Sequence, residues 1–173
     1  MKSDRGLTLV EVMAALLIFT IVIGSIYLLL EHGTRVWHET SEETNLRNQA
    51  NTAMAYIQKS LTQAQTPPNG ENAVRVSSSR LEIRTAWESV TPPVVSDQIV
   101  FEFRPDSTNH SVTRLYRGTL KNPSGTAVSL EDTNFAGSAF ALSGNRILIH
   151  LELKGPRGHV YRLDASARYL LGQ

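Results

Sequence analysis

Residues 6–30 of the chain are GLTLVEVMAALLIFTIVIGSIYLLL, an almost wholly apolar run that contains one carboxylate, Glu11. Between Val12 and Leu30 there are 19 residues without a formal charge. About 20 residues, each rising about 1.5 Å, let a helix cross a hydrocarbon core about 30 Å thick. The run therefore predicts a transmembrane helix. Glu11 needs an explanation, because a carboxylate in a bilayer costs roughly 2.5–3.5 kcal/mol at the centre and less near an end.

The same run does not match a cleavable secretory signal, whose apolar core is roughly 7–15 residues long and ends in a small-x-small site. This run is longer, and the leucines at 28–30 are followed by Glu31 instead of small residues. Lys2 and Arg5 precede the run against one acid, Asp4. The positive-inside tendency then predicts a single pass through the cytoplasmic membrane, with the N-terminus in the cytoplasm and the rest outside.

Two interpretations of Glu11 remain open from the residues alone. The carboxylate could lie near the headgroups and simply be tolerated, or it could pair with a cation inside the membrane. The apolar run holds no lysine or arginine. A cut between Gly6 and Leu7 would, however, create a positively charged amino terminus at the edge of the run.

The order Gly6, Leu7-Thr8-Leu9-Val10-Glu11 and then an apolar run resembles the class III signal of type IV pilins and pseudopilins. The resemblance implies that a membrane-embedded prepilin peptidase cuts after Gly6 on the cytoplasmic side and N-methylates Leu7. It also implies that Glu11 neutralises the amino terminus of a neighbouring subunit as the helices pack into a filament. Leu7 departs conservatively from the family pattern, in which the first mature residue is usually Phe. These specific motifs are confined to the first 30 residues.

Residues 46–64 predict an amphipathic helix that continues beyond the membrane. Apolar side chains recur there at spacings of three or four, as Leu46, Ala50, Ala53, Met54, Ile57, Leu61 and Ala64. This spacing places them on one helix face, which another part of the chain must cover. No proline precedes Pro67, so we expect helix from Leu7 to about Gln65. Gly33 could kink it, at a cost of roughly 1 kcal/mol relative to alanine.

The sequence beyond this helix predicts antiparallel β-structure. The stretch Thr66-Pro67-Pro68-Asn69-Gly70 ends the helix, because prolines and glycine break it. Apolar and polar side chains then alternate as in half-buried strands, with Leu81, Ile83, Thr85 and Trp87 on the inner face of the first run. Turn-rich breaks predict hairpins over 99–117 and 146–170. Residues 118–145 are polar and predict a long excursion that could hold one short strand.

These elements predict an α+β protein in which a long N-terminal helix packs on a twisted antiparallel sheet. The predicted division is a leader peptide at 1–6, a transmembrane segment at 7–30, an amphipathic helix at 31–65 and an antiparallel β domain at 66–173. The resemblance to pilins implies the same architecture, with the outer half of the helix packed on a globular β domain.

The composition excludes several kinds of site. The chain has no cysteine, which excludes disulfides, thiolate metal sites and a lipidated cysteine anchor. No motif for nucleophilic, zinc, phosphate or dinucleotide chemistry occurs. Turn chemistry explains the acidic loops at 106–110 and 131–134, which hold too few oxygens for calcium. We predict no catalytic residue, no cofactor and no metal. We also expect His150 to lie on the surface, and Trp37 and Trp87 to pack in the core or between helix and sheet.

The formal net charge of +1 is too small to attract nucleic acid strongly by electrostatics. From Thr66 onward there are 12 lysines and arginines and 10 acids, and most of the basic residues are arginines. A nucleic-acid footprint needs these side chains on one face, which a sequence does not reveal. Because they alternate with acids, we expect solvated strand faces and no contact with DNA.

Two classes of function fit the sequence. The first is a minor pilin or pseudopilin, a structural subunit of a type II secretion pseudopilus or a type IV pilus; its implied partners are prepilin peptidase, other pilins in a filament or tip complex and the inner-membrane assembly platform. The segments Arg35-Val36-Trp37 and 54–59 loosely resemble J-type minor pseudopilins and W-type minor pilins. A competence pseudopilin that acts in DNA uptake is an alternative role. The second class is a membrane-tethered enzyme or sensor domain, which would keep its leader.

Overall fold

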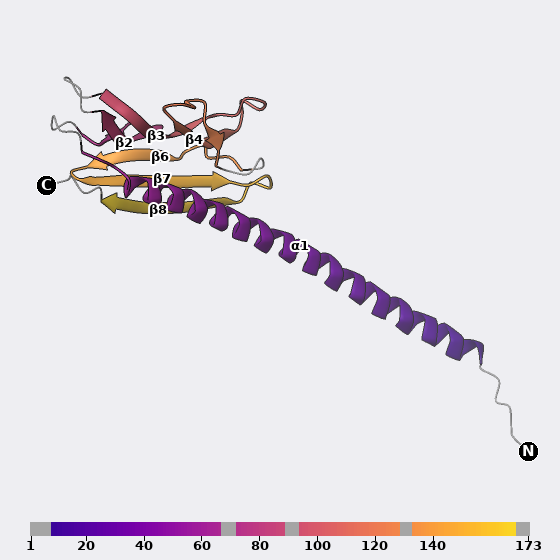
Figure 1. Ribbon diagram of the computed structural model, residues 1–173. Helices are drawn as coiled ribbons and strands as arrows, with labels where there is room; N and C mark the ends of the chain where they lie inside the picture. Colours follow the sequence, from indigo (N-terminus) through magenta and orange to yellow (C-terminus); the bar gives the residue numbers. More distant parts are fainter. Residues whose placement is uncertain (1–7, 67–71, 89–93, 129–132, 169–173) are drawn as a thin grey trace, which may run out of the picture. The chain divides into compact units, whose positions relative to one another are not determined.

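The computed structural model describes residues 8–66, 72–88, 94–128 and 133–168 (Figure 1). By its internal contacts the chain divides into two compact units, Met1–Ser41 and Glu42–Gln173. The first unit contains the N-terminal part of a helix. The second contains the rest of that helix and the eight strands that the structure describes.

The helix α1 extends over Leu9–Leu61, a length of 53 residues, and passes Gly33 without a break. It ends before the predicted limit near Gln65. The N–H groups of Gln63 and Ala64 donate to the carbonyls three residues earlier, at 3.0 and 3.2 Å. This tighter turn finishes the helix before the two prolines, which lie outside the described residues.

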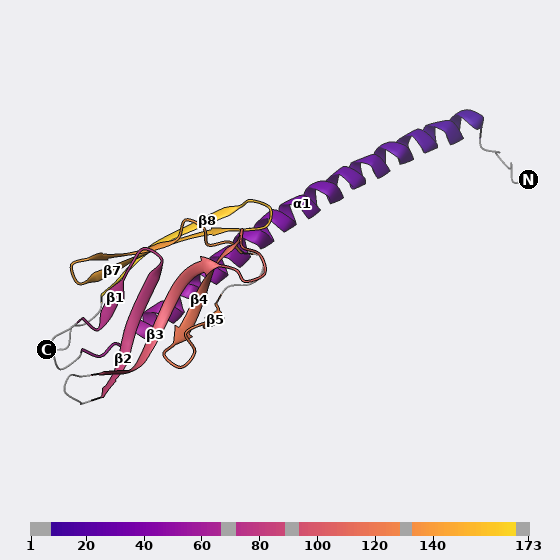
Figure 2. The ribbon, with the colours of Figure 1, turned by 90° about the horizontal axis from the view of Figure 1, so that it is seen from above.

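Two antiparallel sheets make up the rest of the second unit. The five-stranded sheet has the order β1 (Val74–Val76), β2 (Arg80–Glu88), β3 (Val94–Pro105), β4 (Thr113–Thr119) and β5 (Thr126–Ala127). The three-stranded sheet has the order β6 (Ala139–Ser143), β7 (Arg146–Lys154) and β8 (Val160–Arg168). Figure 2 shows β7 and β8 apart from β2, β3 and β4. The α+β class and the antiparallel pairing are confirmed, although the strands form two sheets where the sequence predicted one.

Both predicted hairpins are present. β3 pairs with β4 and β7 pairs with β8, each in antiparallel register. β6 was missed as a full sheet member, because its residues Ala139–Ser143 include small side chains and lie in a stretch rich in serine, glycine and asparagine. The backbone N–H of Phe140 in β6 donates to the carbonyl of Ser78 at 2.9 Å, so β6 meets the turn between β1 and β2.

The predicted helix stripe is confirmed as the centre of the core. Six members of the stripe are buried in the hydrophobic core: Leu46, Ala50, Ala53, Met54, Ile57 and Leu61. The seventh, Ala64, is half-buried and packs against this core. The cluster also contains Phe101 and Leu115 of the five-stranded sheet and Leu151 of the three-stranded sheet. Full burial of one such aliphatic side chain contributes about 1.5–3 kcal/mol. The stripe therefore joins α1 and both sheets within the second unit.

The alternation predicted for β2 fails in its second half. A register shift against β3 falls between Arg84 and Ala86, as a β-bulge produces. Arg84 is buried, whereas Thr85 and Trp87 are half-buried. The guanidinium of Arg84 lies 5.1 Å from the centre of the Trp87 ring. Arg84 is thus a buried cation that stacks on an aromatic ring.

The two tryptophans have different environments. The indole N–H of Trp87 donates to the carbonyl of Gln65 at 3.1 Å, which attaches the end of the helix region to β2. Trp37 is 73% exposed, so the prediction that it packs in a core is wrong for the isolated chain.

Candidate functional site at the start of the helix

Thr8 and Glu11 form a reciprocal cap at the first turn of α1. The backbone N–H and the hydroxyl of Thr8 donate to Glu11 Oε2 at 2.8 and 2.9 Å. The backbone N–H of Glu11 donates in return to Thr8 Oγ1 at 3.3 Å. This arrangement is a capping box, in which threonine at the N-cap and glutamate at the third helical position satisfy each other's backbone N–H groups.

The capping box assigns Glu11 a second role, which the sequence interpretation missed. The signal was available, because Thr8-Leu9-Val10-Glu11 has the T-x-x-E spacing of this motif just before an apolar run. A carboxylate near the positive end of a helix also interacts favourably with the helix dipole. Glu11 therefore starts the helix within its own chain, whatever partner it has between chains. The predicted cleavage residues Gly6 and Leu7 lie outside the described residues.

The segment that follows the cap exposes apolar side chains on all sides. Leu9 is 78% exposed, Phe19 61% and Leu29 72%. α1 contains a window long and apolar enough to cross a membrane, and none of that window is buried within the chain. A helix that is apolar all round is typical of lipid or of packing against other helices.

Two hydroxyl groups inside the apolar segment are satisfied by the helix itself. Thr20 Oγ1 donates to the carbonyl of Leu16 at 2.7 Å, and Ser25 Oγ donates to the carbonyl of Ile21 at 2.9 Å. Such i−4 bonds hide a polar group that a hydrocarbon solvent would leave unpaired. The segment can thus enter a bilayer without an unsatisfied hydroxyl at either position.

Comparison with known families agrees with this geometry. Residues 1–27 match the family model of the prokaryotic N-terminal methylation motif. The chain is type IV pilin-like. The methylation motif implies processing by prepilin peptidase and assembly with other pilins. Neither the comparison with curated proteins nor that with solved structures gives a match.

The methylation motif lies within the first unit, and in the second unit the acidic loop at 106–110 shows ordered turn chemistry. Asp106 Oδ1 accepts the backbone N–H groups of Thr108 and Asn109 at 2.7 and 3.1 Å. Hydrogen bonds from Thr108 and Asn109, with the nearby Arg114 guanidinium, lower the pKa of Asp106 to about 2. Within the ranges that the structure describes, no three side chains of histidine, aspartate or glutamate gather as metal ligands. The turn interpretation of this loop is confirmed, whereas residues 131 and 132 of the other loop lie outside the described residues.

The outer face of the five-stranded sheet carries both signs of charge. Arg80 Nε lies 2.8 Å from Glu82 Oε1, and Arg80 Nη1 lies 3.7 Å from Glu102 Oε1. Arg104 Nη1 lies 3.9 Å from Glu102 Oε2, and its guanidinium lies 3.9 Å from the centre of the Tyr116 ring. This face is a ladder of alternating ion pairs.

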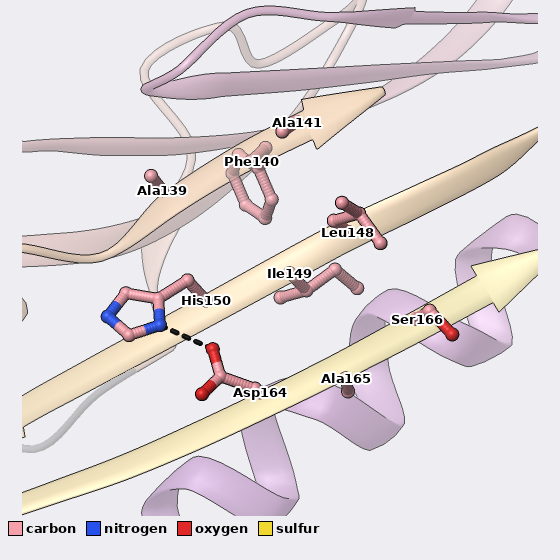
Figure 3. A pocket seen from close by; sticks show the side chains of 9 residues that line it. All are labelled: Ala139, Phe140, Ala141, Leu148, Ile149, His150, Asp164, Ala165 and Ser166. Carbon is pink, nitrogen blue, oxygen red and sulfur yellow. Dashed lines mark hydrogen bonds and ion pairs between the residues drawn. The ribbon is translucent and has the colours of Figure 1, made fainter. Parts of the chain in front are cut away.

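The outer face of the three-stranded sheet contains a shallow, mainly apolar depression (Figure 3). Its volume is about 510 Å³, and its lining includes Ala139, Ala141, Leu148 and Ser166. At one end His150 Nδ1 lies 2.5 Å from Asp164 Oδ1, while Ser166 lies away from the imidazole (Figure 3). The three polar residues therefore do not make a nucleophile–base pair. His150, with a side chain 38% exposed, is near the surface as predicted.

Proposed function

We propose that the protein is a minor pilin or pseudopilin, a structural subunit that acts by assembly and not by catalysis. The observation that carries the proposal is the methylation motif at 1–27, which overlaps a helical segment that exposes apolar side chains on all sides. A catalytic or sensory domain needs an anchor of that kind, but it does not need a peptidase site and a glutamate at the first helical turn.

In this proposal each residue of the motif has a defined task, and Glu11 has two. Prepilin peptidase cuts between Gly6 and Leu7 and methylates the new amine, which keeps its positive charge. The cut leaves that amine one residue before Thr8, whose N–H is bound by Glu11. In the unassembled subunit Glu11 caps its own helix. In the assembled filament Glu11 pairs with the amine of a neighbouring subunit, where low dielectric strengthens the attraction.

The proposal also covers the place of this subunit in a secretion or pilus system. The subunit would be anchored in the cytoplasmic membrane with its β domain outside, and would join other pilins through the assembly platform. The exposed Trp37 on α1, beyond the apolar run, is available for such a contact. A J-type pseudopilin of type II secretion or a W-type minor pilin is the preferred role. A competence pseudopilin would use the same motif.

The test is a Glu11→Val variant expressed with its native partner pilins. We expect insertion and cleavage after Gly6 to persist, because insertion needs the apolar run and the peptidase recognises the leader. Co-purification or crosslinking with partner pilins from membranes should fall at least about tenfold, as loss of a well-placed buried ion pair predicts.

Two further variants separate the roles of Glu11. Glu43→Val removes an exposed carboxylate from the same helix and should leave association unchanged. Thr8→Ala removes the capping hydroxyl while the carboxylate stays, and should weaken association far less than Glu11→Val. If Glu11→Val associates normally, Glu11 is not the intersubunit partner. If Thr8→Ala is equally defective, capping explains the effect and pairing does not.

A further inference from the structure

Trp37 and Val36 are apolar side chains of α1 that lie beyond the apolar run and are 73% and 45% exposed. Ile21 is the middle of the uncharged stretch 12–30, and Trp37 follows it by about 24 Å along the helix. A bilayer with its headgroups extends about 20–22 Å from its centre. With the run centred in the membrane, Trp37 therefore lies outside the hydrocarbon, where an exposed apolar surface indicates contact with a protein partner.

The charged and titratable side chains of residues 31–41 are confined to one side of the helix. At about 100° per residue, all of them lie at least about 120° from a line along the helix midway between Gly33 and Trp37. They are Glu31, His32, Arg35, His38 and Glu39. The other six residues of this segment are uncharged and lie within about 80° of that line. Lipid headgroups surround a membrane-crossing helix on every side and do not explain this separation, whereas a protein neighbour on the uncharged side does.

Gly33 makes a notch in the uncharged side about one turn before Trp37. A Cβ at Gly33 would meet nothing within 4 Å, so the notch is open. Glycine inside a helix costs roughly 1 kcal/mol relative to alanine, yet α1 passes Gly33 without a break. Because glycine has no side chain, a neighbouring helix can approach closely at this position. The uncharged side thus carries both a large projecting side chain and a gap that could receive one.

The offset that pairs Glu11 with a neighbour's amine also places Trp37 at the level of the neighbour's Gly33. This step rests on the proposed function, in which Glu11 pairs with the amine of Leu7, four positions earlier in the sequence. Parallel helices that make this pair are offset by about 6 Å. Trp37 likewise follows Gly33 by four positions. Glu11 and Trp37 also lie within about a quarter turn of each other around the helix, so one neighbour can meet both.

We propose that Trp37 of one subunit packs into the Gly33 notch of a second copy of this chain, with the two helices parallel and offset by about one turn. The second copy is the occupant because this sequence carries both the projecting indole and the notch at the spacing that the offset requires. Glu42, whose Oε1 accepts the Arg157 N–H at 3.1 Å, and the buried Leu46 lie on the other side of the helix. The contact therefore uses a side of α1 that the core of the second unit does not use.

The test is cysteine crosslinking of the full-length chain in membranes of a host with an active prepilin peptidase and the native partner pilins. The chain has no cysteine of its own, so each introduced thiol reports one position. Thr40→Cys and Thr44→Cys lie on the uncharged side, four positions apart, and leave Gly33 and Trp37 intact. The offset brings position 44 of one copy level with position 40 of the other. Oxidation of the two variants expressed together should give at least about threefold more dimer than either variant alone, because Cα atoms more than about 7 Å apart cannot form a disulfide.

Two variants remove the two parts of the contact. Gly33→Leu fills the notch, and Trp37→Ala removes the indole; each should reduce the mixed crosslink to the level of the single variants. Gly24→Leu is the matched control for Gly33→Leu, because a Cβ at either glycine meets nothing within 4 Å and Gly24 lies on the opposite side of the helix. His38→Ala is the control for Trp37→Ala, since His38 is also exposed but lies outside the uncharged side. Both controls should leave the crosslink unchanged.

The same membranes report cleavage after Gly6 and the Glu11-dependent association with partner pilins, which separates this contact from the proposed function. The contact is overturned, and the proposed function stands, if Gly33→Leu or Trp37→Ala keeps the mixed crosslink while Glu11→Val still loses association. It is also overturned if either control loses the crosslink, if the crosslinked species contains a different pilin, or if no mixed crosslink forms, as expected for an indole that faces lipid. A chain that is not cut after Gly6 would overturn both proposals.

Discussion

The two halves of α1 differ in whether their apolar side chains are exposed or buried within the chain. Residues 9–30 expose apolar side chains on every side and bury none within the chain. Residues 46–61 carry polar side chains on most faces and bury one apolar stripe against both sheets. One unbroken helix therefore meets two environments. The difference shows that the period of the apolar pattern, more than helix propensity, specifies what each half contacts.

The largest expected effect comes from cutting the helix at two places. A chain that begins at Glu31 lacks the apolar run and should be a folded, soluble protein. A chain that begins at Thr66 also lacks the stripe, which exposes the sheet residues that Ile57 and Leu61 cover, and should aggregate. Size-exclusion chromatography and thermal melting compare the two. A soluble shorter chain with a cooperative melt would show that the sheets do not need the helix.

A smaller effect is expected from one pair of isoleucine substitutions. Ile57 is 0% exposed within the stripe, whereas Ile26 is 51% exposed in the apolar run. Ile57→Ala should destabilise the second unit by about 2–5 kcal/mol, because it leaves a cavity. Ile26→Ala should leave the melting of that unit unchanged. Denaturant unfolding of the chain in detergent measures both, and equal effects would contradict the division between the halves.

The smallest expected effect is a loss of stability of the second unit at acid pH. Hydrogen bonds and Arg114 hold the pKa of Asp106 at about 2, below its unfolded value. Because the folded pKa is lowered, this carboxylate stabilises the fold above about pH 4, and the contribution is lost as the pH falls toward 2.

Asp106→Asn tests this assignment. It should lower the Tm at pH 6 by about 5 °C and flatten the acid limb of the Tm profile. Glu88→Gln is the control, because the Glu88 side chain is exposed. An acid limb that is identical in the Asp106 variant would show that another group controls it.

Some of these features could be predicted from the sequence. The stripe from Leu46 to Ala64 and the strand pairs β3–β4 and β7–β8 follow from local periodicity, which survives when an element packs on one face. β6 could not be predicted, because alanine and serine give weak strand signals and its pairing depends on β7. The bulge at Arg84 likewise depends on the register against β3.

Some features of the candidate site could likewise be predicted from the sequence, and others could not. The methylation motif is local, so Gly6, Leu7 and Glu11 could be singled out from the residues. The capping bond of Glu11 to Thr8 was also signalled locally but was assigned no role. The contact of Glu42 with Arg157 could not be predicted, since it joins residues 115 apart and is created by the packing of the hairpin on the helix.

If the apolar half of α1 is an assembly segment, the chain must first be cut after Gly6, and the mature N-terminus reports that cut. The chain should be expressed in a host with an active prepilin peptidase, purified from membranes and examined by mass spectrometry of its N-terminal peptide. We expect a chain that begins at Leu7 with a methylated amine. A membrane form that retains Lys2 and Arg5 would contradict it and would favour a tethered domain with a plain signal anchor.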